Sequence, residues 1–202
     1  IVALLNSVNQ HILKENLKNT LLLQMILNDF IEKSTCNINK EAFYTYFKLS
    51  SNIEDKKHIQ RVINDVKKLH VHNKLPDFKI VNYNNSQKNI RQLVKNKNSV
   101  IFFWNPKYLE EASMVARMNH LTKKYPDVYF ITVKTNKIDQ HHAKGFDIKN
   151  QFYLQKESKA NLFLTSKLPR TLLVNKKGII TNGDASIHRY IIDSQIEELQ
   201  KK

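Results

Sequence analysis

Apolar residues recur at helical spacing in the first part of the chain. Leu17, Leu21, Ile26 and Phe30, with their neighbours, give the apolar spacing of a helix that we predict from about 15 to 33. The segment NKEAFYTYFKL, which begins at Asn39, carries aromatic residues at the same spacing and predicts a second helix. Both helices have one apolar stripe, so each must pack against a neighbour rather than stand alone.

The segment SNIEDKKHIQRVINDVKKLHV, residues 51–71, gives the clearest helical pattern. Ser51 and Glu54 have the spacing of a capping box, in which each side chain bonds to the other residue's backbone N–H. Neither Gly nor Pro occurs in residues 1–74. We therefore expect an all-helical N-terminal region that packs as helical hairpins.

The pattern changes at Pro76, because proline cannot continue a helix. Short apolar runs then alternate with amphipathic segments, which is typical of an α/β sheet. Between the last two runs, the turn NKKG places Gly178 where a hairpin needs positive φ. Strands are predicted at 78–82, 99–104, 128–134, 170–175 and 178–182, and helices at 87–95, 107–124 and up to about Gln200.

Charge is distributed unevenly over the 202 residues. Lys and Arg number 33 against 18 Asp and Glu, a net charge of +15. Residues 1–74 hold 11 basic and 7 acidic residues, a net of +4, and residues 75–202 hold 22 and 11, a net of +11. Such a field favours acidic partners, although a general Lys and Asn bias gives the same totals. Nucleic acid is not expected as a partner, because aromatic residues near the lysines, such as Phe130, are needed for the core.

The cysteine count limits redox chemistry. Cys36 is the single cysteine, so neither an internal disulfide nor a CxxC pair can form. No apolar stretch approaches the roughly 20 residues of a membrane span. The chain opens on Ile1 rather than Met, and we expect that a signal, a lipid anchor or a further domain lies upstream.

Histidines form two groups that could be considered as metal ligands. His141 and His142 are adjacent, near Asp139, and adjacent histidines point in different directions on most backbones. His70 and His72 lie near the end of the third predicted helix, with His58 earlier in it. We expect solvated loops and helix surfaces in both places, and neither a metal nor a cofactor.

Three segments together resemble one fold family. They are LPDFKIVNYNNSQKNIRQLVKNKNSVIFFW, LTKKYPDVYFITVKTN and LPRTLLVNKKGIITNG, and they occur in the family's order over about 125 residues. The chain is similar here to TlpA-type thioredoxin-fold proteins, which are disulfide reductases related to peroxiredoxins. The resemblance implies an α/β fold with a thioredoxin-like central sheet flanked by helices, preceded by the all-helical region. We expect domains at 1–74 and 75–202.

In that family, a three-residue spacer after Phe-Trp leads to Cys-x-x-Cys at a helix start. Counting from Trp104 places those two positions at Tyr108 and Glu111, within YLEE. A reductase needs a thiolate of lowered pKa and a second thiol that resolves the mixed disulfide. Neither a phenol nor a carboxylate exchanges disulfides, so the resemblance implies a redox-inactive site.

The resemblance also implies a cis bond before Pro169 and a groove between the first helix and the strand that follows this proline. In the family, extended chains bind there beside the residue before the proline. The corresponding groove residues here are Pro106, Lys107, Tyr108, Leu168, Pro169 and Arg170. Lys107 and Arg170 would favour acidic residues in a bound peptide.

These observations favour a non-catalytic thioredoxin-fold interaction module with a protein partner, either an extended peptide or an acidic surface. One alternative is an oxidoreductase-related protein that acts with a partner's thiol, and another is a basic surface that binds acidic polymers. The Lys- and Asn-rich, cysteine-poor sequence is similar to envelope thioredoxin-like proteins of Bacteroidetes. This similarity implies the periplasm or cell envelope, with the cytoplasm as the alternative.

Overall fold

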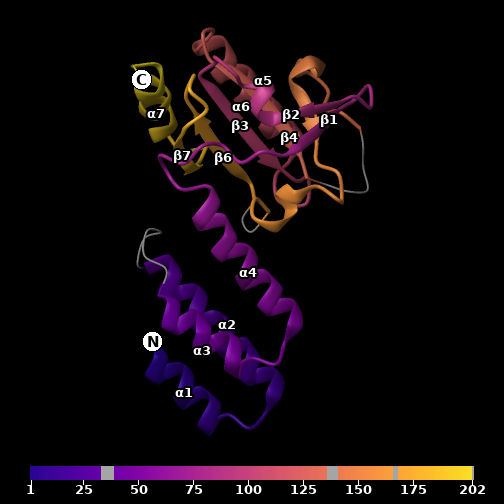
Figure 1. The fold of residues 1–202 in the computed structure, drawn as a ribbon. Coiled ribbons are helices and arrows are strands. Elements are labelled where there is room, and N and C mark those ends of the chain that lie inside the picture. Colours follow the sequence, from indigo (N-terminus) through magenta and orange to yellow (C-terminus); the bar gives the residue numbers. More distant parts are fainter. Residues whose placement is uncertain (33–38, 136–140, 166–167, 202) are drawn as a thin grey trace. The chain divides into compact units, whose positions relative to one another are not determined.

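The structure is a computed structural model that describes residues 1–32, 39–135, 141–165 and 168–201. It divides into two compact units, Ile1–Val66 and Lys67–Lys202, which we call the helical unit and the sheet unit (Figure 1). The predicted α/β class with a preceding helical region is confirmed. Among the described residues, no helix is long and apolar enough to cross a membrane.

The helical unit contains α1 (Val2–His11), α2 (Glu15–Glu32), α3 (Lys40–Leu49) and most of α4 (Ile53–Lys68). The helices expected from about 15 to 33 and over 39–49 are therefore confirmed. Their apolar faces meet in one core, to which all four helices contribute. Its buried members are Leu5, Leu22, Ile26, Ala42, Phe43, Tyr46, Ile59 and Ile63.

The start of α4 differs from the expected capping box. The Asn52 side chain, rather than that of Ser51, accepts hydrogen bonds from the backbone N–H groups of Glu54 and Asp55 at 3.0 and 3.2 Å. Ser51 instead bonds to α2, where its hydroxyl donates to Glu15 and accepts from Asn19. Asn is as good an N-cap as Ser, so tertiary bonds to α2 decide which residue caps.

The described part of the sheet unit forms a seven-stranded mixed sheet in the order β2-β1-β5-β4-β3-β6-β7 (Figure 1). Parallel pairing joins β3 to β4 and β4 to β5, and the other neighbours are antiparallel. The strands are β1 (Lys79–Asn82), β2 (Gln87–Asn89), β3 (Ser99–Trp104), β4 (Tyr129–Lys134), β5 (Gln151–Tyr153), β6 (Arg170–Val174) and β7 (Ile180–Ala185). The helices are α5 (Ile90–Leu93), α6 (Glu111–Lys124), α7 (Ile191–Lys201) and the short 3-10 helices η1 (Ile148–Asn150) and η2 (Lys159–Leu162).

Strand β3 is buried along its whole length, and its side chains alternate between two cores. Val100, Phe102 and Trp104 pack on the face covered by α6 and α7. Ile101 and Phe103 pack on the other face, with residues of α5 and the segment around η2. The burial that we expected from the strand pattern is confirmed for Phe102, Trp104, Ile131 and Leu173.

Two expectations in the sheet unit were wrong. Residues 87–89, expected as the start of a helix, form β2, and α5 begins only at Ile90, where the Asn89 side chain caps it. Strand β5 lies between the strands predicted at 128–134 and 170–175, where no strand was predicted. It was missed because its first residue, Gln151, is polar, yet the Gln151 amide is buried and bonds to the backbone of Ala143 and Phe146.

Residues 67–74, which we had placed in the helical region, lie in the sheet unit because their backbone joins β7 and its turn. His72 N–H donates to Ile180 O at 2.9 Å, and Leu75 N–H donates to Gly178 O at 2.9 Å. Gly183 allows this close approach, because a Cβ there would lie 2.1 Å from Leu69 O. Gly178 has φ of 74°, as the hairpin prediction requires.

Helices α6 and α7 are joined at their outer faces by a cluster around Asp193. The Asp193 carboxylate accepts hydrogen bonds of 2.8 Å from Lys124 Nζ and from the Tyr125 hydroxyl. Arg117 lies 3.9 Å from the second carboxylate oxygen. The Lys124 hydrogen bond chiefly, with Tyr125 and the nearby positive charges, lowers the pKa of Asp193 below its ordinary value.

The first prediction tests the core around β3. The Phe102 side chain is 1% exposed, so Phe102→Ala leaves a cavity and should lower the free energy of unfolding by about 3–5 kcal/mol. Denaturant unfolding of the full chain measures this change. The control is Tyr190→Ala, whose side chain is 91% exposed and should have little effect. A loss below about 1 kcal/mol for Phe102→Ala would contradict the strand's position in the core.

The second prediction concerns pH. Because the folded pKa of Asp193 is lowered, the carboxylate stabilises the fold above its unfolded pKa, and this stability is lost as pH falls through the folded pKa. At neutral pH, Asp193→Asn should reduce the free energy of unfolding by about 0.2–1 kcal/mol, because the pair is open to solvent. Denaturant melts of both proteins across the acidic range should show the difference vanishing at low pH. A difference independent of pH would disprove the role of the charge.

Candidate functional site

The loop after β3 forms a tight turn organised by Asn105. The Asn105 side-chain oxygen accepts from Lys107 N–H at 2.9 Å, and its backbone oxygen accepts from Tyr108 N–H at 2.9 Å and Leu109 N–H at 3.2 Å. Asn side chains favour such turns because they offer the backbone an alternative to helical bonds. Tyr108 is consequently held outside the helix, with its side chain 57% exposed.

Helix α6 begins at Glu111, later than the expected start at residue 107. Glu110 occupies the N-cap position, but its side chain makes no capping hydrogen bond. The Glu111 carboxylate accepts from Lys144 N–H at 3.2 Å and so joins the helix start to the loop before β5. Position 108 therefore lies in the turn before the helix, three residues from its first residue.

The segment before β6 forms the other side of the candidate site. The Leu168–Pro169 peptide bond is cis, as the resemblance implied. Leu168 and Pro169 are partly exposed, and the Leu168 side chain also packs against the core beneath. Arg170 pairs with Phe103 across the antiparallel β3–β6 ladder.

Arg170 is less available than its place in the expected groove suggests. The whole residue is only 5% exposed, whereas Pro106, Lys107 and Tyr108 are exposed. A buried guanidinium contributes to the shape and field of the site but cannot contact a partner through an open surface. The accessible charge at the candidate site is therefore that of Lys107, whose Nζ lies 5.6 Å from the Tyr108 ring centroid.

A buried lysine lies at the same end of the sheet, and sequence patterning missed it. Lys134, the last residue of β4, is 1% exposed and pairs in register with Trp104. Its Nζ donates to His141 O at 2.9 Å and lies 5.5 Å from the Trp104 ring centroid. The strand pattern hides such a residue, because a lysine at a strand end is ordinarily exposed.

The histidines do not assemble into a ligand set. His141 and His142 are exposed, and the His142 ring packs edge-on against Tyr83, with centroids 5.7 Å apart. The His70 ring is 2.6 Å from Val71 O, a hydrogen bond in which Nδ1 donates. In the part of the chain that the structure describes, no group of three His, Cys, Asp or Glu residues could hold a metal ion. Cys36 and Asp139 lie outside the described residues.

Topology brings the predicted site residues to one end of the sheet. Phe103 pairs with Arg170, so the chain leaving β3 and the chain entering β6 meet at that end. Pro106, Lys107 and Tyr108 come from the first chain segment, and Leu168 and Pro169 come from the second. The groove between the two segments remains a prediction.

No protein-family model matches this sequence, and no curated protein matches it. Similar folds are found among solved structures. A protein of Bacteroides vulgatus to which thiol-disulfide oxidoreductase activity is ascribed shares 20% identity, with a TM-score of 0.53 over 65% of this chain and 98% of that one. The C-terminal domain of a similarly described protein from Bacteroides thetaiotaomicron shares 18% identity, with a TM-score of 0.51 over 66% and 98%.

A third similar structure extends the likeness to the helical unit. It is a thioredoxin-like protein from Bacteroides caccae with 14% identity and a TM-score of 0.54. That alignment covers 98% of this chain and 75% of the other, so it includes the N-terminal helices. At these identities the likeness concerns the fold, and the sheet unit of this chain has a thioredoxin-like fold.

Proposed function

We propose that this protein is a non-catalytic interaction module, in which a thioredoxin-like fold binds a partner at the site where its relatives in fold carry thiols. The observation that carries the proposal is Tyr108, an exposed aromatic residue at the position expected for the first cysteine. Tyr is enriched at the energetic centres of protein interfaces. It offers a large, rigid contact area with a polar tip.

Loss of redox activity is supported by the residue types at two positions. The single cysteine, Cys36, belongs to the part of the sequence before the sheet unit. Tyr108 and Glu111 stand at the positions of the pair that would exchange disulfides, and α6 starts after position 108. Neither a phenol nor a carboxylate exchanges disulfides.

The expected partner is an extended peptide that adds beside Leu168. None of the other described residues forms a backbone hydrogen bond with Leu168, so a peptide strand could pair with it. Addition of a strand uses such main-chain groups for affinity and neighbouring side chains for specificity. Lys107 would favour an acidic residue in the peptide, and Tyr108 would pack against an apolar one.

The periplasm or cell envelope is the compartment that we propose for this module. The proposal rests on the similarity of its Lys- and Asn-rich, cysteine-poor sequence to envelope thioredoxin-like proteins of Bacteroidetes. The appropriate source for partner capture is therefore a native envelope fraction.

The third prediction is chemical inertness. The purified chain should not accelerate reduction of insulin by dithiothreitol above the uncatalysed rate, because no thiol pair is present. Cys36→Ser serves as the control and should behave identically. Turnover by the native chain that Cys36→Ser abolishes would instead show that Cys36 acts as a nucleophile with another thiol.

The fourth prediction locates the partner. In affinity capture from envelope fractions, followed by mass spectrometry, Tyr108→Ala and Lys107→Glu should each reduce recovery of a stoichiometric partner. Tyr108→Ala should weaken binding by at least about 2 kcal/mol if Tyr108 is a hot spot. Both residues are exposed, so thermal melts should stay close to those of the native chain.

Tyr190→Ala is the matched control, because it removes an equally large and more exposed ring from the loop before α7. It should leave capture unchanged. Arg170→Glu is a poor variant for this test, since reversing a buried charge would damage the fold itself. If Tyr108→Ala and Lys107→Glu both capture as much partner as the native chain does, the partner does not use this site.

A further inference from the structure

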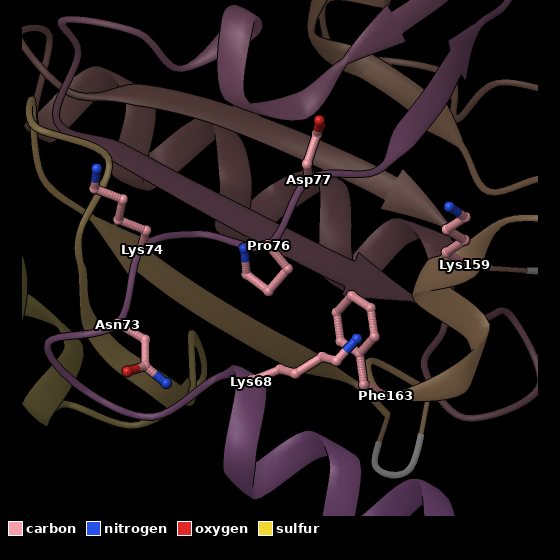
Figure 2. A pocket seen from close by; sticks show the side chains of 7 residues that line it. All are labelled: Lys68, Asn73, Lys74, Pro76, Asp77, Lys159 and Phe163. Carbon is pink, nitrogen blue, oxygen red and sulfur yellow. The ribbon is translucent and has the colours of Figure 1, made fainter.

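Two adjacent pockets of the sheet unit share Lys74 and are surrounded by cations. The first has a volume of about 420 Å³ and is drawn in Figure 2. The second has a volume of about 320 Å³ and lies beside the turn between β6 and β7. Their cationic residues, which we call the basic surface, are Lys68, Lys74, Arg91, Lys95, Lys159, Lys176 and Lys177.

Among the described residues, no ion pair neutralises the basic surface. All seven of its residues are exposed. The ion pairs found among the described residues of both units use Lys18, Lys57, Arg117 and Lys124 instead. Asp77 is the one acidic residue among those that line the two pockets. It accepts a hydrogen bond from Asn89 and points away from Phe163 in Figure 2. Clustered like charges repel, and they concentrate anions in the hollows between them.

The residues come together only in the fold. Lys68 ends α4, Lys74 lies in the segment that joins β7, and Lys176 and Lys177 form the β6–β7 turn. Lys95 lies just before β3, whose first residue, Ser99, pairs with Val174 at the end of β6. The second pocket is therefore at the opposite end of β3 from Tyr108 and Leu168.

The geometry disfavours two kinds of anion. The turn's backbone N–H groups are not available to a small free phosphate, since Lys176 N donates to Asn98, and Lys177 N and Gly178 N donate to Asn175. Single-stranded nucleic acid needs exposed aromatic rings on which bases stack. Phe163, the aromatic residue of the first pocket, is only 1% exposed and lies under Lys68, whose Nζ is 4.9 Å from the ring centroid.

We propose that the basic surface docks the protein on a membrane surface of anionic phospholipids. Flexible, separately exposed lysines suit many headgroups that each present one phosphate, and clusters of 4–8 Lys and Arg bind anionic lipid in this way. The apolar residues that line the second pocket, Leu75 and Val94, are buried, so the attachment is electrostatic and does not insert side chains among the acyl chains. This inference does not depend on the function proposed for Tyr108.

The experiment is co-sedimentation of the full chain with vesicles. Native protein should bind mixed phosphatidylglycerol–phosphatidylcholine vesicles, should not bind phosphatidylcholine alone, and should be released by salt. The triple variant Lys74→Glu, Lys95→Glu, Lys177→Glu should bind at least about 10-fold more weakly, because each lysine near the surface contributes to the attraction. Lys→Gln at the same positions should give a smaller loss, and melting curves verify that both variants fold.

The matched control is the triple variant Lys123→Glu, Lys149→Glu, Lys201→Glu, which changes net charge equally at exposed positions outside the basic surface. It should retain most of the binding. An equal loss of vesicle binding in the two triple Lys→Glu variants would show that only net charge matters and would overturn the proposal. Absence of binding to the anionic vesicles would also overturn it, as would tighter binding to duplex DNA than to the vesicles.

Discussion

The antiparallel pairing of β3 with β6 determines which loops of this protein meet. β3 is buried on both faces, and its six residues connect the core beneath α6 and α7 to the core on the other side of the sheet. Because Phe103 opposes Arg170, the chain that leaves β3 and the chain that enters β6 emerge at the same end. A one-residue slip in this register would exchange every side chain between the two cores, so packing holds the site segments in place.

At that end, hydrogen bonds to Asn105 fix the turn that carries Tyr108. Asn105 accepts hydrogen bonds from the N–H groups of the three residues 107–109, and α6 begins only at Glu111. The Glu111 carboxylate accepts from Lys144 N–H and acts as a structural contact. The turn presents Tyr108 as an exposed aromatic residue, which is what the interaction module that we propose requires.

Strands β3, β4 and β6 and helices α2, α3 and α7 could be predicted because each carries a sustained pattern of one period. Short elements could not be predicted in this way. Strand β5 has only three residues and begins with Gln151, whose burial depends on hydrogen bonds to Ala143 and Phe146. At Ser51 the local capping pattern was overridden by tertiary contacts. Ser51 forms hydrogen bonds with α2, and Asn52 caps α4 instead. The buried state of Lys134 and Arg170 could not be predicted, since it depends on neighbouring strands that sequence spacing does not specify.

The positive charge of the sheet unit takes two physical forms with different consequences. Lys134 and Arg170 are buried at the end that carries Tyr108, where desolvation makes their placement costly unless partners hold them. Such charges shape a site and are little affected by salt. The lysines around Lys74 keep their hydration, so they attract anions over about a Debye length, roughly 8 Å at physiological salt, and release them as salt rises. Because the second pocket and Tyr108 lie at opposite ends of β3, attachment through that pocket's lysines leaves the Tyr108 turn open to a peptide.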